Sequence, residues 1–219
     1  MVRIKSVLNS KMGLVVKWFC RRESIKNEAL KRVLRREIMI FRQCDLVETP
    51  WKNGGGITRN IAKEQDKTGT LWRLSMADVD GDGAFSIFPG LTRILTVIQG
   101  DGMVLHGPDG DLQAGYAQPV RFDGGAPVTA TLTQGPIRDF NLMFDTARCE
   151  GDAQTLRDAG TYKVGQAGQT CVLHVIAGTA SVEGKALDVG DTAIRTDAPL
   201  RFDLAQDAVA LTITLRPKD

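Results

Sequence analysis

Histidine is scarce in this chain of 219 residues, which contains only His106 and His174. Neither has a second histidine nearby, so a metal site with three histidines, or with two histidines and a carboxylate, is hard to build. A lone histidine in a strand is more often a hydrogen-bonded packing residue than a metal ligand. The sequence therefore predicts a protein that has no metal and no other cofactor.

Paired cysteines and long apolar runs are also missing. Four cysteines are scattered along the chain without C-x-x-C spacing, which is typical of free thiols in a reducing compartment such as the cytoplasm. No apolar run approaches the roughly 20 residues that a membrane span needs. A G-x-S-x-G nucleophile motif is absent as well, so nothing indicates acyl transfer.

Charge is divided unevenly along the chain. Residues 1–43 hold 12 Lys and Arg against 3 Asp and Glu, a balance of +9. Residues 44–219 hold 16 basic and 23 acidic residues, a balance of −7, so the net charge of +2 conceals an acidic body. Nothing in this body indicates a surface for nucleic acid.

The basic N-terminal segment has helical spacing, with apolar residues at positions 25, 29, 30, 33 and 34 after a candidate N-cap at Ser24. It could be an amphipathic helix for a membrane or nucleic acid. It could also be a targeting peptide, although it lacks a long apolar core and carries acidic residues. We favour an extension outside the fold over residues 1–38, helical or disordered, because a strand-like pattern begins only at Met39.

From Met39 onward the chain has the period of strands, interrupted by glycine-rich turns. Scarcely any stretch has helical spacing, so the sequence predicts an all-β antiparallel barrel or sandwich. The expected strands are 39–42, 57–62, 71–79, 92–98, 103–106, 128–134, 138–145, 171–177, 180–183, 184–191, 200–204 and 208–215.

A weak internal repeat refines this prediction. Leu95–Leu105 parallels Leu173–Val182, because in each segment an apolar strand reaches a glycine turn and returns as a second strand. The second copy continues to a Gly-Asp turn at residues 190–191. This pattern resembles the cupin (RmlC-like) antiparallel β-barrel, and two copies predict a bicupin with halves at residues 39–150 and 151–219.

A glycine-rich turn stands out near the start of the body. Gly54–Gly56 can adopt positive φ or lie close to another group, and they follow Trp51, Lys52 and Asn53. The expected strand that comes next carries Arg59. These residues could hold a small anion, or the segment could be a flexible turn with a packed tryptophan. It is not a phosphate loop, because the lysine precedes the glycines and no helical pattern follows.

Three arginines lie on three expected strands, at positions 59, 73 and 93. An arginine with apolar neighbours is costly to bury unless it meets an anion. Guanidinium groups bind carboxylates through two parallel hydrogen bonds, so two converging arginines would recognise a small carboxylic acid. The alternative is an internal ion pair, such as Arg73 with Asp139, that only ties strands together.

Alternation places further polar residues near these arginines. Ser75 shares a strand face with Arg73, and Asp139 shares one with Asn141, while Phe140 points the other way. An amide beside a carboxylate can bind an imidazole or amide N–H of a ligand. The alternative is a hydrogen-bonded polar seam inside the barrel.

Four motifs in order make the chain similar to the HutD/Ves family: Trp51–Arg59, Trp72–Ala77, Gly83–Arg93 and Gly135–Met143. The resemblance runs from about residue 39 to the C-terminus, and residues 1–38 depart from it. It implies a small bacterial cytoplasmic bicupin without the usual cupin metal site. It also implies a role beside histidine utilisation, in which the protein binds a pathway metabolite and limits pathway activity.

These observations lead to one main hypothesis, a protein that binds a small carboxylate such as urocanate or formiminoglutamate. Neither nucleic acid nor a membrane is expected as a partner, and a homodimer is left open. The expected ligand-binding residues are Trp51, Lys52, Asn53, Arg59, Arg73, Ser75, Arg93, Asp139 and Asn141. The alternative is a metal-free cupin enzyme, an isomerase, epimerase or hydrolase, in which His106 or His174 beside a carboxylate acts as the base. A purely structural protein would be favoured if internal acids consumed every arginine.

Overall fold

A computed structural model describes residues 37–51 and 54–218. These residues form strands joined by turns and a single turn of 3₁₀ helix, η1 (Gln43–Asp45), and the strands pair antiparallel. The predicted all-β antiparallel fold is confirmed. Most of the expected N-terminal extension lies outside the described residues, as do Lys52 and Asn53. Within the described part, no helix is long and apolar enough to cross a membrane.

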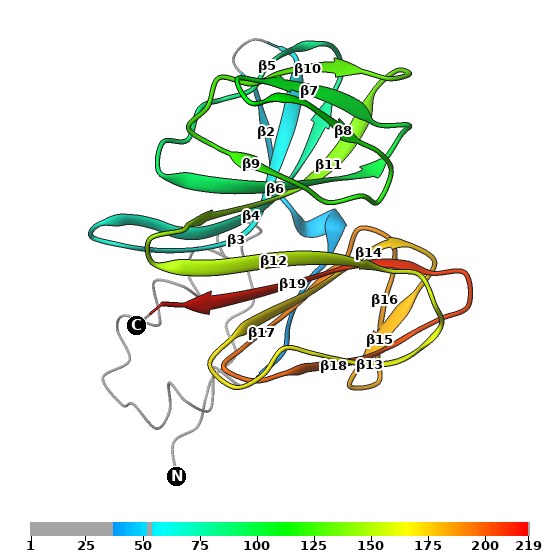
Figure 1. Ribbon diagram of the computed structural model, residues 1–219. Coiled ribbons are helices and arrows are strands. Elements are labelled where there is room, and N and C mark those ends of the chain that lie inside the picture. The colour runs from blue at the N-terminus through cyan, green and yellow to red at the C-terminus, as the bar shows by residue number, and fades with distance from the viewer. Residues whose placement is uncertain (1–36, 52–53, 219) are drawn as a thin grey trace. The chain divides into compact units, whose positions relative to one another are not determined.

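Two sheets form the N-terminal half of the fold (Figure 1). The N-inner sheet has the order β2 (Glu48–Pro50), β3 (Gly56–Asp66), β4 (Gly69–Val79), β11 (Ile137–Asp145), β6 (Leu91–Gln99), β9 (Val120–Asp123). The N-outer sheet has the order β5 (Gly83–Ala84), β10 (Thr129–Leu132), β7 (Met103–Gly107), β8 (Gly110–Ala114). One apolar cluster lies between them, and it draws Leu95 and Val97 from the first sheet and Met103 and Leu105 from the second.

The C-terminal half repeats this arrangement. The C-inner sheet has the order β1 (Met39–Phe41), β17 (Thr192–Thr196), β14 (Thr170–Ala177), β19 (Val209–Pro217), β12 (Cys149–Leu156). The C-outer sheet has the order β13 (Gly160–Val164), β18 (Leu200–Leu204), β15 (Ala180–Val182), β16 (Lys185–Leu187). The apolar core of the C-terminal half includes Leu173, Val175, Leu187 and Phe202, from strands of both sheets.

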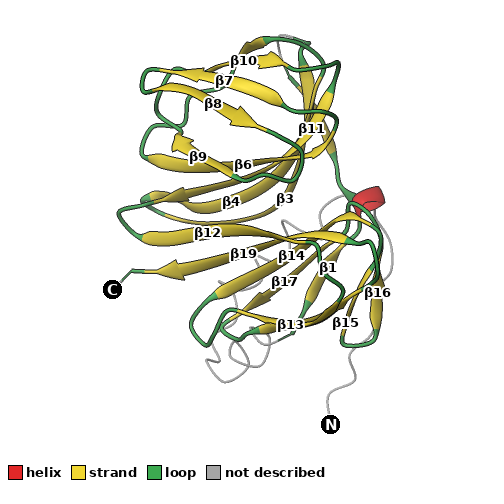
Figure 2. Ribbon diagram, turned by 45° about the vertical axis from the view of Figure 1, so that its right-hand side comes forward, coloured by secondary structure: helices red, strands yellow, loops and turns green. Residues whose placement is uncertain are grey.

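The two inner sheets face each other, and one face of β11 is turned toward the C-inner sheet (Figure 2). Phe140, Leu142 and Phe144 are at most 1% exposed, although their side chains point away from the N-terminal core. The ring of Phe140 lies 4.8 Å from that of His174 on β14, measured between centroids. Strand β11 therefore separates two environments: its even-numbered side chains meet the C-inner sheet, and its odd-numbered side chains face the interior of the N-terminal half.

Strand β1 lies in the sheet of the C-terminal half, although it comes first in the described chain. Met39, Ile40 and Phe41 pair with β17, and Ile40 packs against the C-terminal core. Next to them Arg42 donates a hydrogen bond of 2.5 Å to Asp191, and the chain then returns to β2. The expected division into 39–150 and 151–219 assigned these three apolar residues to the first half. In the structure they pair with the edge strand β17 of the second half, and Ile40 packs against the core of that half.

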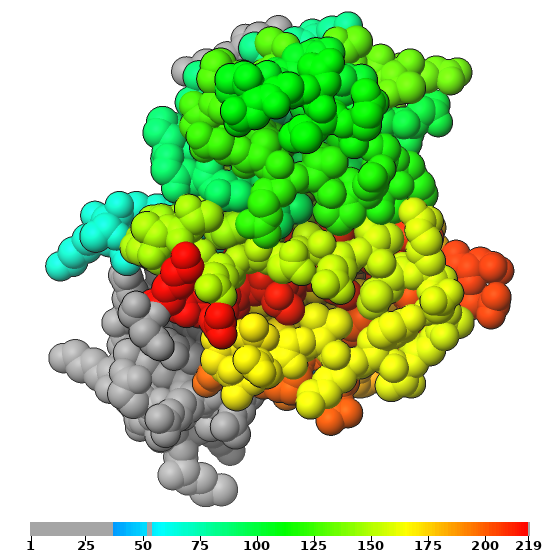
Figure 3. All heavy atoms as spheres, in the orientation of Figure 1, coloured from blue at the N-terminus to red at the C-terminus, as the bar shows by residue number. Residues whose placement is uncertain are grey.

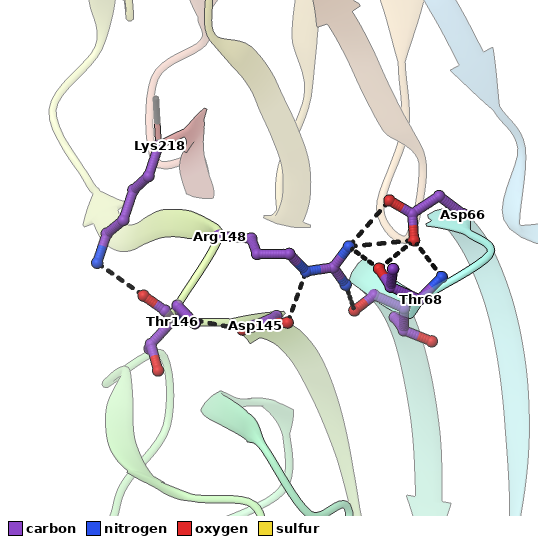
Figure 4. Close-up of polar contacts among 8 residues, drawn as sticks. Asp66, Thr68, Asp145, Thr146, Arg148 and Lys218 are labelled. Atoms are coloured by element: carbon purple, nitrogen blue, oxygen red, sulfur yellow. Dashed lines mark hydrogen bonds and ion pairs between the residues drawn. The ribbon is translucent and has the colours of Figure 1, made fainter.

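The tip of the β3–β4 hairpin is held by Arg148, which follows β11 (Figure 4). Its guanidinium donates to Asp145 at 2.7 Å, to Asp66 at 2.9 and 3.1 Å, and to Thr68 at 2.6 Å. Lys218 is bonded to the same turn, since its Nζ donates to the Thr146 carbonyl at 2.7 Å. Figure 3 shows the C-terminal atoms, in red, lying against this yellow-green region.

Candidate functional site

The described part of the glycine-rich turn consists of Trp51 and Gly54–Gly56. The Trp51 N–H donates to the Gly56 carbonyl at 2.9 Å, and Gly54 has a φ of 74°, a conformation that glycine adopts at no steric cost. A Cβ at Gly56 would lie 2.2 Å from the Asp78 carbonyl oxygen, so only glycine fits there. The Trp51 indole donates to Thr58 Oγ1 at 2.7 Å and packs against the N-terminal core. The turn thus fixes the tryptophan at one end of that interior.

A row of cations crosses the N-inner sheet on its interior face. Lys63 on β3 lies opposite Arg73 on β4, Arg73 lies opposite Met143 on β11, and Met143 lies opposite Arg93 on β6. Residues directly opposite each other on adjacent strands point to the same face, so all four side chains share it. Among the described residues, no carboxylate oxygen lies within 4.0 Å of these three cationic groups. Three neighbouring cations without a carboxylate are the main electrostatic feature of this face.

Arg93 is the deepest of the three, at 5% exposure. Its guanidinium carbon lies 4.9 Å from the ring centroid of Phe85 and 5.0 Å from that of Phe122. One terminal nitrogen donates to Asn141 Oδ1 at 2.6 Å, and the buried Nε has no partner among the described residues. Burial lowers the pKa of Arg93 to about 10; Asp139 opposes this shift and Arg73 adds to it. The group remains a cation at neutral pH, with hydrogen-bonding capacity unused.

Asn141 connects Arg93 to Asp139. Its Oδ1 accepts from Arg93, and its Nδ2 donates to Asp139 Oδ1, so the amide orientation is fixed from both ends. Asp139 is 1% exposed, and burial raises the pKa of its carboxyl to about 7, despite the opposing effects of Arg93 and of a hydrogen bond with the Ala77 backbone. At neutral pH this carboxyl is therefore divided between its charged and neutral forms.

Arg73 lies nearer the solvent and is half-buried. Its Nε donates to Asn60 Oδ1 at 2.8 Å, and its two terminal nitrogens have no hydrogen-bond partner among the described residues. Burial lowers the pKa of Arg73. Ser75, the next residue on this face, is 2% exposed and lies opposite Asn141. The polar face thus runs from an accessible rim, at Asn60 and Arg73, to a buried floor.

Arg59 lies elsewhere, and the expectation that it converges with Arg73 is not met. It lies opposite Met76, whose side chain points to the other face of the sheet. Its guanidinium binds Glu48 at 2.6 Å and Asp78 at 2.7 Å. Burial lowers its pKa, but the hydrogen bonds to Asp78 and Glu48 outweigh burial and raise it overall. Arg59 is therefore an internal ion-pair residue, the alternative weighed for each arginine.

The site residues predicted from the sequence thus divide into three groups. Arg73, Ser75, Arg93, Asp139 and Asn141 share the interior face, with Trp51 at its end. Arg59 points away, and Lys52 and Asn53 lie outside the described residues. Alternation did not identify Asn60 and Lys63, because an irregularity between Asn60 and Ala62 changes which residues of β3 share a face.

Neither histidine joins this cluster. His106 is partly exposed and is bonded to Asp111 at 2.8 Å and to Thr131 at 3.1 Å. His174 is fully buried between the inner sheets; its Nδ1 contacts Thr192 Oγ1 at 2.9 Å, and burial lowers its pKa to about 3. No cluster of three or more histidine, cysteine or acidic side chains suited to a metal ion occurs in the part of the chain that the structure describes.

Two surface depressions lie away from the cation row. One, of about 550 Å³, lies along β12 and β19 and includes Arg121, Glu150 and Arg216. The other, of about 1060 Å³, is lined by Arg42, Arg59 and residues of the β16–β17 turn. Both are open, and their arginines are already hydrogen-bonded: Arg216 to Glu150, Arg121 to the Gly151 carbonyl, and Arg42 to Asp191. The depressions are large, but the cations of the interior face have nitrogens without a hydrogen-bond partner among the described residues: the buried Nε of Arg93 and the terminal nitrogens of Arg73.

The two pairs of antiparallel sheets give the protein a cupin-like all-β fold. Solved structures with low identity share this fold: protein YlbA from E. coli (10% identity, TM-score 0.66, covering 84% of this chain and 93% of that one) and a nickel-bound bacterial pirin from E. coli (10%, TM-score 0.60, 83% and 100%). The chain belongs to the HutD family, whose model matches residues 43–212.

Relatives with higher identity agree with this assignment. A protein in the hutC 3' region of Pseudomonas putida is 36% identical over 171 residues, covering 71% of this chain and 85% of the relative. Protein Ves from Citrobacter koseri is 33% identical over 140 residues, 63% and 72% of the two chains. The structure of HutD from Pseudomonas fluorescens SBW25, described for a formate condition, is 34% identical with a TM-score of 0.74 and covers 84% of this chain and all of that one. The resemblance expected from the four motifs is confirmed.

Proposed function

We propose that this HutD-family protein binds a small carboxylate metabolite at the interior face of its N-terminal half. The observation that carries the proposal is the row of Lys63, Arg73 and Arg93, since none of the three has a carboxylate partner among the described residues. Lys63 is exposed, but Arg73 is half-buried and Arg93 is buried, and such cations are costly unless an anion compensates them. A bound carboxylate would supply that charge and accept hydrogen bonds from nitrogens that now lack partners.

The chemistry of the face favours a carboxylate over a larger or more highly charged anion. The terminal nitrogens of Arg73 form a planar fork that matches two carboxylate oxygens. Asp139 lies near Arg93 and adds partial negative charge, which opposes a dianion such as phosphate. The aromatic rings around Arg93 supply apolar surface for the rest of a small organic acid.

The family membership suggests the biological setting. We propose that the metabolite belongs to histidine utilisation, as urocanate or a formiminoglutamate-type compound, and that binding it modulates the pathway in the cytoplasm. A relative in the hutC 3' region and a structural relative named HutD support this setting. We expect neither nucleic acid nor a membrane as a partner, and a homodimer is compatible with the proposal.

We also propose that the two halves are two cupin-like barrels, a bicupin, with the division near residue 150. Each half has two sheets around its own apolar cluster, which supports this view. Strand β1 would then belong to the second barrel, although it precedes the first in the chain.

One observation favours a second function, a metal-free isomerase, epimerase or hydrolase of a small acid. Asp139 has a pKa of about 7 near Arg93, which suits a general acid or base near neutral pH. Neither histidine is placed to act as the base, so Asp139 would take that role. Incubation with candidate acids, followed by NMR of the small molecule, would distinguish turnover from binding.

The decisive experiment pairs two substitutions of the same type. Arg73→Lys keeps the charge but loses the planar fork, so affinity for a carboxylate should fall about tenfold or more, about 1.4 kcal/mol. Arg59→Lys is the matched control: it should lower the melting temperature, because it disrupts the pairs with Glu48 and Asp78, and leave affinity nearly unchanged.

Calorimetric titration beside melting curves measures both quantities. The titrants are a panel of small carboxylates that includes formate, propionate, glutarate and urocanate. A bound acid should also raise the melting temperature by mass action. Unchanged affinity in Arg73→Lys, or no binding of any acid to the wild-type protein, would contradict the proposal.

A further inference from the structure

An irregularity in β3 lies directly beside Arg73. The pairing of β3 with β4 shifts between Asn60 and Ala62, so Ile61 is an extra residue in the strand. In a regular strand, residues 60 and 63 would point to opposite faces. After the shift, Asn60 lies opposite Ser75 and Lys63 lies opposite Arg73, which places both on the interior face. Such bulges often redirect a side chain beside a binding site.

In this position, the side chain of Asn60 contacts the Nε of Arg73. Its Oδ1 accepts the Arg73 Nε–H at 2.8 Å. A guanidinium can present two different edges to a carboxylate, either its two terminal nitrogens or its Nε with one terminal nitrogen. Because Asn60 occupies Nε, only the edge formed by the two terminal nitrogens remains. Those nitrogens have no partner within the described residues.

We propose that Asn60 is a positioning residue that fixes which edge of Arg73 meets the ligand, and so gives the site a preference for planar two-oxygen anions over spherical ones. This inference rests on the proposed carboxylate site and adds a specificity determinant to it. Lys63 supplies a second cation at the rim without a fixed geometry, because lysine acts as a point charge. Asn60 itself is exposed, so its role does not derive from core packing.

The first test needs no ligand. In ¹⁵N NMR of the wild-type protein, the Arg73 Nε–H should exchange slowly with solvent because it is hydrogen-bonded. In Asn60→Ala it should exchange much faster. Gln65→Ala is the matched control, since Gln65 is another exposed amide residue of β3. Equal exchange in the wild type and Asn60→Ala would overturn the positioning role.

The second test measures selectivity. Propionate is titrated calorimetrically into the wild-type protein, Asn60→Ala and Gln65→Ala, with chloride as a competing spherical anion. In Asn60→Ala, the fork of Arg73 is no longer held in one orientation, so propionate affinity should fall about fivefold and chloride should compete better. Asn60→Ser, which keeps an oxygen acceptor, should restore part of the selectivity. Asn60→Asp should weaken propionate most, because a carboxylate would then occupy the fork.

These outcomes separate the inference from the proposed function. If the wild-type protein binds propionate and Asn60→Ala binds it with unchanged selectivity over chloride, the positioning role is wrong and the carboxylate site stands. If propionate does not bind the wild-type protein but other acids of the panel do, the same comparison is made with the tightest of them. If no acid binds, the proposed function fails, and the exchange rate of the Nε–H still tests the contact between Asn60 and Arg73.

Discussion

The same guanidinium group is present in Arg59, Arg73 and Arg93, but the neighbouring residues determine whether each one can bind a ligand. Arg59 is neutralised by two carboxylates on the far face of the N-inner sheet. Arg93 is enclosed by aromatic rings and bound to an amide. Arg73 has a single hydrogen bond, to Asn60, and an accessible fork. Among the three, Arg73 is therefore best placed to receive a ligand from solvent.

Asp139 should make the stability of the protein depend on pH. Its pKa is about 7 in the folded protein and 3.8 ordinarily, so the folded state holds the proton more tightly. A raised pKa contributes stability that is fully present below pH 4 and is lost as the pH rises through 7. At 1.36 kcal/mol per pKa unit, the free energy of unfolding falls by at most about 4 kcal/mol.

The substitution Asp139→Asn removes this titration and keeps an oxygen that can accept from Asn141. Relative to the wild type, the variant should gain stability as the pH rises from about 4 to about 7. Urea unfolding at several pH values measures the difference, and the comparison cancels the titration of groups that both proteins share, such as His174. A difference that stays constant over this range would show that Asp139 is ionised throughout.

For single residues, the sequence correctly predicted which side chains of two strands share a face. Alternation correctly separated Asp139 and Asn141 from Phe140, and Arg73 from Trp72, because β4 and this part of β11 are regular strands. It failed on β3, where the extra residue Ile61 changes the faces. No residue type marks this irregularity, so Asn60 and Lys63 could not be found by counting.

Among the elements, the β3–β4 hairpin depends on a residue that is distant in the sequence. Arg148 contacts Asp66 and Thr68 at the hairpin tip and Asp145 beside β11 (Figure 4). The interaction with Arg148 lowers the pKa of Asp145, and the neighbouring Thr68 contributes most to lowering that of Asp66. This contact fixes the far end of the two strands that carry Lys63 and Arg73.

Arg148→Ala should loosen the hairpin tip without unfolding the protein. Amide hydrogen exchange of residues 65–70 should become faster, while exchange in β14 and β19 should not change. Arg216→Ala is a control of the same type, because Arg216 forms a comparable exposed pair with Glu150 elsewhere on the surface. Since Asp66 is exposed and Arg148 is partly exposed, the effect should also weaken at high salt in the wild type. Unchanged exchange at the tip would show that the turn itself sets its rigidity.

Most central strands were predictable from the sequence, and several edge strands were not. The apolar segments 71–79, 92–98 and 171–177 coincide with β4, β6 and β14, because both faces of these strands are buried. Strands β8, β12 and β13 are polar and half-exposed at sheet edges, so their sequences lack the apolar alternation that identifies a strand. Their pairing is set by partners distant in the sequence.

For the whole molecule, the boundary at Met39 leads to a further prediction. Strand β1 begins at Met39, and Ile38 just before it packs against the C-terminal core. A chain that starts at Glu37 keeps this contact and should therefore melt within about 1 °C of the full chain. Differential scanning calorimetry of both proteins measures this. A loss of several degrees would show that the preceding segment stabilises the body.

The pairing of β1 with β17 has a consequence for how the protein is made. On the ribosome, Met39–Phe41 is synthesised early, but its partner strand follows about 150 residues later, at a delay of roughly ten to thirty seconds. All the strands of the N-terminal half lie within residues 48–145, so that half can complete its sheets during the delay. The first of the described strands to be synthesised is thus among the last to be paired, and until then its open edge is available to chaperones or to another nascent chain.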